Sequence, residues 1–146
     1  MATEIEHKYL VTNDSYRSMA VEKHHIRQGY LLRDPERVVR VRVIDQQGRI
    51  TIKGISHGDA RAEYEYEIPF DDAVKLLDLC VPPIIEKTRH IVPYEGMTWE
   101  VDEFHGHRLG LVLAEIELPK AGACYSTPPF VGENVTSDQR YYNVNL

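Results

Sequence analysis

The chain has 146 residues and a mass of 16.9 kDa, the size of one domain that buries its own core without disulfides or a structural metal. Hydrophobic residues make up 42% and charged residues 27%, which excludes disordered, collagen-like and mucin-like chains. The 17 basic and 23 acidic residues give a net charge of -6, which argues against a broadly basic surface for nucleic acid. We therefore expect one domain over residues 1–146 and no nucleic-acid partner.

The N-terminal residues and the cysteines favour a cytoplasmic protein. Residues 1–6 have neither the basic nor the apolar region of a signal peptide, and no apolar run approaches the roughly 20 residues that cross a bilayer. Cys80 and Cys124 lie far apart and form no C-x-x-C pair, so neither a disulfide framework nor a cysteine-based zinc site is indicated. We expect a cytoplasmic location and no membrane partner.

The chain begins with a strand pattern. Residues 4–10 alternate charged with apolar or aromatic side chains at a period of two, which is typical of β-strands. Asn13 or Asp14 then predicts the start of a helix that runs from Ser15 to Glu22. The neighbouring pair His24-His25 is interpreted as a feature of the surface or of the helix end.

The strand pattern returns in the middle of the chain. Residues 39–44 and 50–53 alternate in the same way, and the Gly-bearing segment 45–48 between them predicts a hairpin turn. Residues 63–68 form the next alternating segment. A second helix is expected to open at Pro69-Phe70 and to run to Leu79, where the following Pro82-Pro83 stops it.

The remaining segments are again strands. Residues 87–92, 99–102 and 115–118 alternate, and residues 94–97 predict a turn between the first two. His105-Gly106-His107 is interpreted as a turn around the glycine rather than as a metal site, because no further zinc-type ligands lie nearby in the sequence. Together the elements predict an α+β fold that is mainly antiparallel β.

Charged residues dominate one face of the predicted strands. The simplest interpretation is amphipathic strands with a solvated face, but such a face usually includes Ser, Thr, Asn and Gln as well. The alternative is a closed barrel of about eight strands whose charged face points inward, wide enough for one small ligand. The acids of this face are Glu4, Glu6, Glu63, Glu65, Glu100, Asp102, Glu115 and Glu117. The bases are Lys8, Arg40, Arg42, Lys53, Lys87 and Arg89.

Opposite charges in a confined space restrict the choice of ligand. Uncompensated buried charge is costly, so the bases need an anion and the clustered acids need a cation. Carboxylates without cysteine favour Mg²⁺ or Mn²⁺, and arginine at alternate strand positions suits phosphate oxygens. The sequence has no phosphate-binding glycine loop, kinase signature or G-x-S-x-G elbow. It therefore predicts a short phosphate chain bridged by a divalent metal and held by side chains.

The order of the motifs resembles a known family. The opening Glu4-Ile5-Glu6-His7-Lys8 is similar to the E-x-E-x-K start of CYTH domains, also called triphosphate tunnel metalloenzymes. It is followed by the Arg40/Arg42 strand, and further segments of the pattern continue to the end of the chain. These segments are 52–54, 63–68, 86–89, 99–104, 114–118 and 135–143.

This resemblance implies a fold and a set of residue roles. The fold is an eight-stranded antiparallel β-tunnel with flanking helices, open at its ends, which binds a triphosphate and a divalent metal inside and often forms a homodimer. The implied metal ligands are Glu4, Glu6, Glu115 and Glu117. The implied phosphate clamp is Lys8, Arg40, Arg42, Lys53, Lys87 and Arg89, with Arg140 added from the C-terminal segment. Glu63 and Glu65 are assigned to a second metal or to water, and Asp102 to orienting basic side chains.

One feature departs from the family pattern. The sequence stops at Leu146, shortly after residues 141–143, so little chain is expected to be left for a C-terminal helix that plugs one end of the tunnel.

The function predicted on these grounds is metal-dependent hydrolysis of inorganic triphosphate to pyrophosphate and phosphate. Mg²⁺ or Mn²⁺ is the expected cofactor. Lys53 is a candidate to stabilise or protonate the leaving oxygen, and Glu63 or Glu65 to receive the proton of the attacking water. Three alternatives remain: a class IV adenylate cyclase, hydrolysis of thiamine or nucleoside triphosphates, and a module that binds polyphosphate without turning it over.

Overall fold

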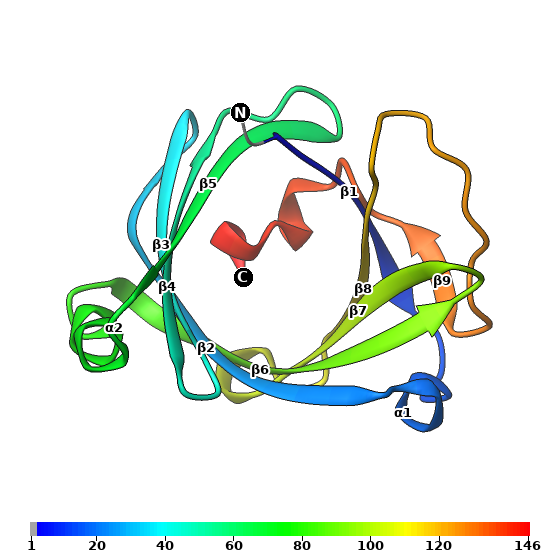
Figure 1. Ribbon diagram of the computed structural model, residues 1–146, viewed down its shortest axis with the longest axis horizontal. Coiled ribbons are helices and arrows are strands. Elements are labelled where there is room, and N and C mark those ends of the chain that lie inside the picture. The colour runs from blue at the N-terminus through cyan, green and yellow to red at the C-terminus, as the bar shows by residue number, and fades with distance from the viewer. Residues whose placement is uncertain (1–2) are drawn as a thin grey trace.

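The computed structural model describes residues 3–146 and shows an antiparallel β-barrel (Figure 1). The nine strands of the described chain follow the order β5-β4-β3-β2-β6-β7-β8-β1-β9 in one sheet, and a further pairing joins β5 to β1. Their bounds are β1 Thr3–Val11, β2 Glu22–Asp34, β3 Arg37–Ile44, β4 Gln47–Gly54, β5 Ala60–Ile68, β6 Val81–Tyr94, β7 Met97–Phe104, β8 Val112–Glu117 and β9 Val131–Asn134.

Strand β1 closes the ring by pairing on both of its edges. Residues 6–10 pair with β8 on one edge, while residues 3–5 pair with β5 on the other. The C-terminal part of β1 is then free to pair with β9, which lies outside the ring. Strands β1–β8 thus form an eight-stranded closed barrel, as predicted, and β9 is an addition that the sequence pattern did not indicate.

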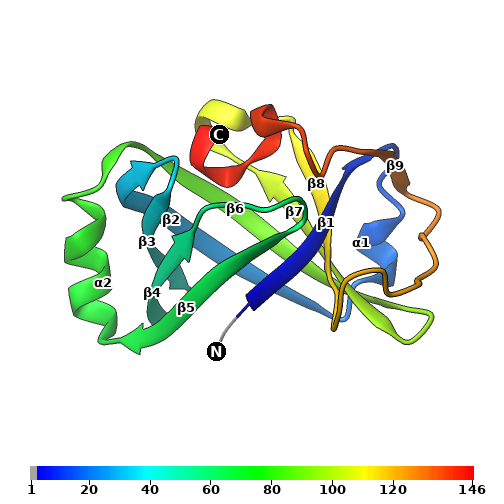
Figure 2. The same cartoon turned by 90° about the horizontal axis from the view of Figure 1, so that it is seen from above.

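Both helices lie outside the barrel, on opposite sides (Figure 2). Helix α1 covers only Tyr16–Met19, because β2 already begins at Glu22, and α2 covers Phe70–Leu77. Of the two interpretations of His24-His25, the helix end is wrong, since both residues lie within β2, whereas the surface agrees with their partly exposed side chains. Pro82 and Pro83 lie in β6 rather than in the turn after α2. No helix within residues 3–146 is long and apolar enough to cross a membrane.

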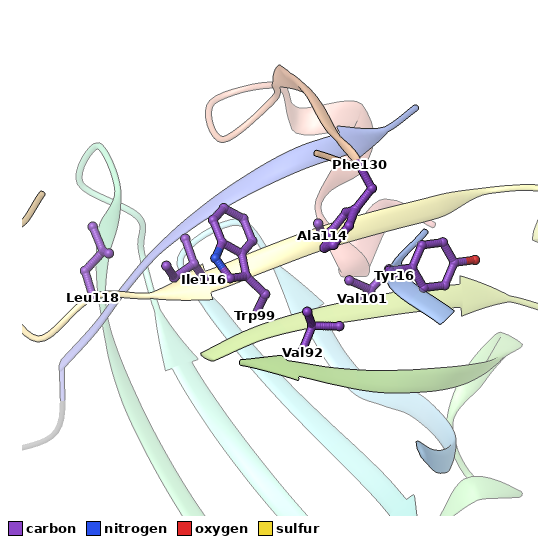
Figure 3. Packing of buried hydrophobic residues seen from close by; sticks show 8 residues of the cluster. All are labelled: Tyr16, Val92, Trp99, Val101, Ala114, Ile116, Leu118 and Phe130. Carbon is purple, nitrogen blue, oxygen red and sulfur yellow. The ribbon is translucent and has the colours of Figure 1, made fainter. Parts of the chain in front are cut away.

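The apolar faces of the strands point outward and are covered there. One cluster packs α1 and Phe130 against the outer face of β6, β7 and β8, with the fully buried Trp99 at its centre (Figure 3). A second cluster packs Ala73 and Leu77 of α2 against Val41 and Val43 of β3. Because apolar burial takes place outside the ring, the charged face of each strand is left to line the interior.

A third apolar cluster lies inside the barrel and closes part of it. It joins Tyr30, Phe104 and Leu113 of the wall to Leu146 at the end of the chain. Two short 3₁₀ turns, Gln139–Tyr141 and Asn143–Asn145, carry the chain into the ring of strands at one end of the barrel (Figures 1 and 2). The expected shortage of chain for a C-terminal helix agrees with this end of the barrel, which is filled by two 3₁₀ turns of three residues each and by Leu146.

Candidate active site

The inward faces of the strands form a cavity in which most of the lining side chains are charged. Alternation places every second residue of a strand on the same face, so the E-x-E-x-K run of β1 projects Glu4, Glu6 and Lys8 together into the barrel. The other charged lining residues are Arg40, Arg42, Arg49, Lys53, Asp59, Arg61, Glu63, Glu65, Arg89, Glu100, Glu115 and Glu117.

One side of the cavity is rich in carboxylates. Glu6 is the cross-strand partner of Glu117, and Lys8 is the partner of Glu115. The Lys8 ammonium lies 3.3 Å from Glu115 Oε1 and also donates to the carbonyl oxygen of Tyr141 at 2.8 Å. Glu6 has no lysine or arginine within ion-pair distance among residues 3–146. The carboxylates of β1 and β8 therefore outnumber the cations that touch them.

Lys53 links β4 to the same acidic side. Its ammonium donates to Glu4 Oε1 at 2.9 Å and lies 3.4 Å from Glu63 Oε2. Burial raises the pKa of Glu4 against the opposing charge of Lys53, and the neighbouring Glu63 carboxylate adds to the increase. Glu4 and Glu63 thus both contact the Lys53 ammonium on the cavity wall.

The pKa values of the glutamates on this side reflect burial first and the neighbouring charges second. Burial, with the charges of Glu115 and Glu4, raises the pKa of Glu6 to about 8. Burial also raises the pKa of Glu117, and Glu4 and Glu100 add to the increase. Burial alone would raise the pKa of Glu115 as well, but Lys8, Arg89 and Lys87 outweigh it and hold that pKa at about 2. Glu6 and Glu117, which contact no lysine or arginine among residues 3–146, are therefore the glutamates whose charged forms a bound cation would stabilise most.

The opposite side of the cavity is basic. Arg40 and Arg42 of β3 approach Glu65 Oε2 through their Nη2 atoms at 3.8 and 3.6 Å, which is loose for an ion pair. Glu65 makes its closer contacts with β4, where Thr51 donates to it at 2.8 Å and Arg49 at 3.2 Å. Burial tends to raise the pKa of Glu65, but the hydrogen bond from Thr51 and the charges of the arginines outweigh it and lower this pKa below its usual value.

Arg89 is held in place by Asp102. The guanidinium donates to both carboxylate oxygens, from Nε at 2.8 Å and from Nη2 at 2.9 Å, which fixes its plane. Lys87 lies 2.7 Å from the same carboxylate and is fully buried. Burial lowers the pKa of Lys87 to about 8. The charge of Arg89 lowers this pKa further, while the charge of Asp102 opposes the decrease. Asp102 thus orients two basic side chains, as the sequence predicted.

The structure separates two residues from the predicted phosphate clamp. Lys87 does not line the cavity: its ammonium contacts Asp102 and lies 5.4 Å from the centroid of the Phe104 ring. Arg140 lies outside the barrel, where its largely exposed side chain forms an ion pair with Asp138 at 2.7 Å. The 3₁₀ turn that starts after Asp138 directs Arg140 outward, so the structure does not bring it together with the other residues of the predicted clamp.

Several lining or wall residues were not predicted from the sequence, among them Asp59, Arg49, Arg61, Gln28 and Tyr30. Arg49 and Arg61 lie near the starts of β4 and β5, outside the alternating segments 50–53 and 63–68 from which these strands were predicted. Gln28 and Tyr30 belong to β2, which has no charged alternation on its inner face. Only the strand pairing identifies Gln28 and Tyr30 as wall residues, because Gln28 lies opposite Arg42 and Tyr30 lies opposite Arg40.

The carboxylate side fits a divalent cation in part. Its oxygen-only donor set suits Mg²⁺ or Mn²⁺, and the buried Glu6 has no lysine or arginine in contact among residues 3–146. No group of three or more histidine, cysteine or acidic side chains in residues 3–146 is drawn together into a complete metal shell. Mg²⁺ commonly binds through one or two carboxylates with phosphate oxygens and water, so such a shell is not needed.

Comparison with known proteins agrees with this geometry. The CYTH domain family model matches residues 2–144. An inorganic triphosphatase of Acetivibrio thermocellus is 50% identical over 147 residues, covering 100% of this chain and 94% of the relative. An inorganic triphosphatase of Nitrosomonas europaea is 34% identical over 149 residues, covering 99% of this chain and 96% of the relative.

Solved structures show the same likeness. The crystal structure of an inorganic triphosphatase aligns with a TM-score of 0.69 at 32% identity, over 99% of this chain and 94% of that one. The family match, the two relatives and the closed charged barrel agree with the family that the sequence motifs indicated. The chain belongs to the CYTH domain family.

Proposed function

We propose that this protein hydrolyses inorganic triphosphate to pyrophosphate and phosphate with the help of Mg²⁺ or Mn²⁺. The observation that carries the proposal is a closed cavity whose basic side faces a carboxylate side with too few cations of its own. A linear polyanion satisfies the first side and a divalent cation the second. The full-length likeness to two inorganic triphosphatases supports the choice of substrate.

The basic side binds and orients the phosphate chain. Arg89 presents a guanidinium whose plane is set by Asp102, and Arg40 and Arg42 are held only loosely by Glu65. Loosely held guanidinium groups can exchange Glu65 for phosphate oxygens at low cost, because arginine binds phosphate through two parallel N–H donors. Charge on the transferring phosphoryl group is stabilised in this way, which is the main source of catalysis in phosphoryl transfer.

Proton transfer is assigned to the Lys53 group. The ammonium of Lys53 is positioned on the cavity wall to stabilise the leaving oxygen, and Glu63 at 3.4 Å from it is the proton acceptor for the attacking water. Glu65 is less suited to that role, because Thr51 and the arginines lower its pKa. We assign Glu65 to holding Arg40 and Arg42 before substrate binds.

Glu4, Glu6, Glu115 and Glu117 are the residues that would hold the metal. When bound, a divalent cation would neutralise the phosphate chain and polarise its phosphorus–oxygen bonds. Glu6 and Glu117 are the most available of the four, since Lys53 already contacts Glu4 and Lys8 already contacts Glu115.

The proposal extends to location and assembly. Both cysteines are free thiols, which supports a cytoplasmic location. A homodimer is supported by partly exposed apolar pairs on the outer face of the barrel, such as Ile52 of β4 opposite Tyr64 of β5.

A parallel assay of three substrates tests the proposed activity. Release of phosphate and pyrophosphate is measured from inorganic triphosphate, ATP and thiamine triphosphate, each with Mg²⁺, with Mn²⁺ and with chelator. We expect metal-dependent turnover with the highest kcat/KM for inorganic triphosphate. Cyclic AMP and pyrophosphate from ATP would instead identify a cyclase, and binding without turnover of any substrate would identify a binding module.

A further inference from the structure

Strand β2 contributes two uncharged polar side chains to the inner wall of the barrel. Gln28 lies directly opposite Arg42, and Tyr30 lies directly opposite Arg40. Directly opposed residues of antiparallel strands share one face, so Gln28 faces inward beside an arginine that lines the cavity. Gln28 is 0% exposed.

The hydrogen-bonding capacity of this part of the wall is unused. Neither the amide nitrogen nor the amide oxygen of Gln28 has a hydrogen-bond partner among the described residues, and the buried Nε atoms of Arg40 and Arg42 lack one too. A buried polar group without a partner is destabilising, and most such groups in folded proteins are paired. An apolar side chain of similar length would suit the free protein better, so Gln28 is better explained by an interaction made when ligand is bound.

The contacts of Arg42 indicate what that interaction is. Its terminal nitrogen Nη2 lies 3.6 Å from Glu65, too far for a strong hydrogen bond, so the guanidinium plane is not fixed from that side. A guanidinium is rigid, so one hydrogen bond at Nε sets the direction of both terminal nitrogens. The residue opposite Arg42 on the adjacent strand is Gln28, whose amide oxygen is an acceptor without a partner among the described residues. Arg89 shows the same principle with its Nε atom bound to Asp102.

We propose that Gln28 is a positioning residue, whose amide oxygen accepts a hydrogen bond from Nε of Arg42 when triphosphate occupies the cavity. The two terminal nitrogens of Arg42 are then aligned for paired contacts with phosphate oxygens. A neutral amide suits this position, because a carboxylate would neutralise part of the charge that attracts the anion. This inference rests on the proposed function of the cavity.

The near-isosteric variant Gln28→Met separates positioning from packing. It removes two unpaired buried polar groups, so the thermal midpoint of the free protein is expected to stay unchanged or to rise. The KM for inorganic triphosphate and its Kd by calorimetry are expected to rise about tenfold, as for loss of one hydrogen bond to a charged group, with kcat changing less. The control Ile26→Leu changes packing at the next inward residue of β2 and is expected to leave KM unchanged.

A double-mutant cycle identifies the partner of Gln28. Lysine has no Nε donor, so in an Arg42→Lys background the Gln28→Met change is expected to have no further effect on KM. A full effect in that background, an unchanged KM in Gln28→Met alone, or an equal rise in Ile26→Leu would each overturn the inference.

A measurement on the unmodified protein applies even if a variant does not fold. The Nε proton of Arg42 should become protected from hydrogen exchange when inorganic triphosphate is added, and an unprotected proton in the saturated protein would overturn the inference. If the unmodified protein neither binds nor hydrolyses inorganic triphosphate, the proposed function itself fails. If it does both and Gln28→Met behaves identically, only the role of Gln28 fails.

Discussion

At the scale of single residues, the cavity is arranged for ligands rather than for stability. Glu6 is buried beside Glu115 and Glu4 without a cation in contact, so its charged form is disfavoured in the free protein. Arg42 shows the converse, because burial together with Arg40 and Arg89 lowers its pKa to about 9. Groups of like charge persist in a folded protein when a bound ligand compensates them.

Replacing Glu6 tests this directly. In Glu6→Gln we expect metal-dependent phosphate release to fall at least about a hundredfold, since a ligand that the metal depends on is lost. In chelator the same variant is expected to unfold at an equal or higher temperature than the unmodified protein, because a crowded carboxylate has been removed. The exposed Glu133→Gln is the control and should change neither property. Near-normal turnover of Glu6→Gln would contradict its assignment as a metal ligand.

Asp102 provides a prediction for the pH dependence of stability. Burial tends to raise the pKa of Asp102, but the charges of Arg89 and Lys87 outweigh it and hold this pKa well below its usual value. A carboxyl group whose pKa is lower in the folded state stabilises the fold above its unfolded pKa of about 4, and this stabilisation is lost as the pH falls. We expect Asp102→Asn to lower the unfolding free energy at pH 7 by about 3–5 kcal/mol, as for a broken buried ion pair.

The comparison across pH completes that test. Between pH 5 and 2 the unfolding free energy measured in denaturant should fall more steeply for the unmodified protein than for Asp102→Asn. Asp138→Asn, which removes the partner of the exposed Arg140, should behave like the unmodified protein. Equal pH profiles for Asp102→Asn and the unmodified protein would show that Asp102 is not a stabilising carboxylate.

At the scale of elements, the sequence pattern located the strands whose inner faces are charged and missed those whose inner faces are not. The segments that alternate, such as 39–44 and 63–68, are found as β3 and β5. Strand β2 was not predicted, because its inner face carries the uncharged Gln28 and Tyr30 while Gly29 on its outer face packs tightly against Cys80 and Ile84. Pairing with β3 and β6, not local pattern, makes this segment a strand.

The C-terminal turns form an element that local sequence could not place. Leu146 is buried among Phe104, Leu113 and Tyr30, which lie far from it in the chain. We expect Leu146→Ala to lower the unfolding free energy by about 2–3 kcal/mol, the usual cost of a leucine truncated in a core. Loosening this end should also raise the ratio of ATP to inorganic triphosphate turnover, since residues 142 and 143 line the cavity.

The exposed Leu109 is the control for this change. It lies at the end of the 3₁₀ turn Gly106–Arg108 and is 78% exposed, so Leu109→Ala should leave both stability and the substrate ratio unchanged. An unchanged substrate ratio in a destabilised Leu146→Ala protein would show that the C-terminal turns stabilise the barrel without selecting the substrate.

At the scale of the whole molecule, the barrel inverts the usual arrangement of a small protein. Its apolar clusters lie mainly outside the ring, under α1 and α2, and the interior holds opposed charges. The family and the closed barrel could be predicted because the acids and bases recur in a fixed order along the chain. The separation of Lys87 and Arg140 from the cavity could not, because it depends on the packing of the Lys87 ammonium against Asp102 and Phe104 and on one tight turn.

The most direct test of the central claim is a crystal structure with inorganic triphosphate and Mn²⁺, in which the anomalous signal locates the metal. We predict a manganese peak within about 2.2 Å of carboxylate oxygens from Glu6 and one or more of Glu4, Glu115 and Glu117, the distance expected for hard oxygen ligands. The phosphate chain should bridge that metal to Arg40, Arg42 and Arg89. A metal or a triphosphate bound only outside the barrel would contradict the proposed active site.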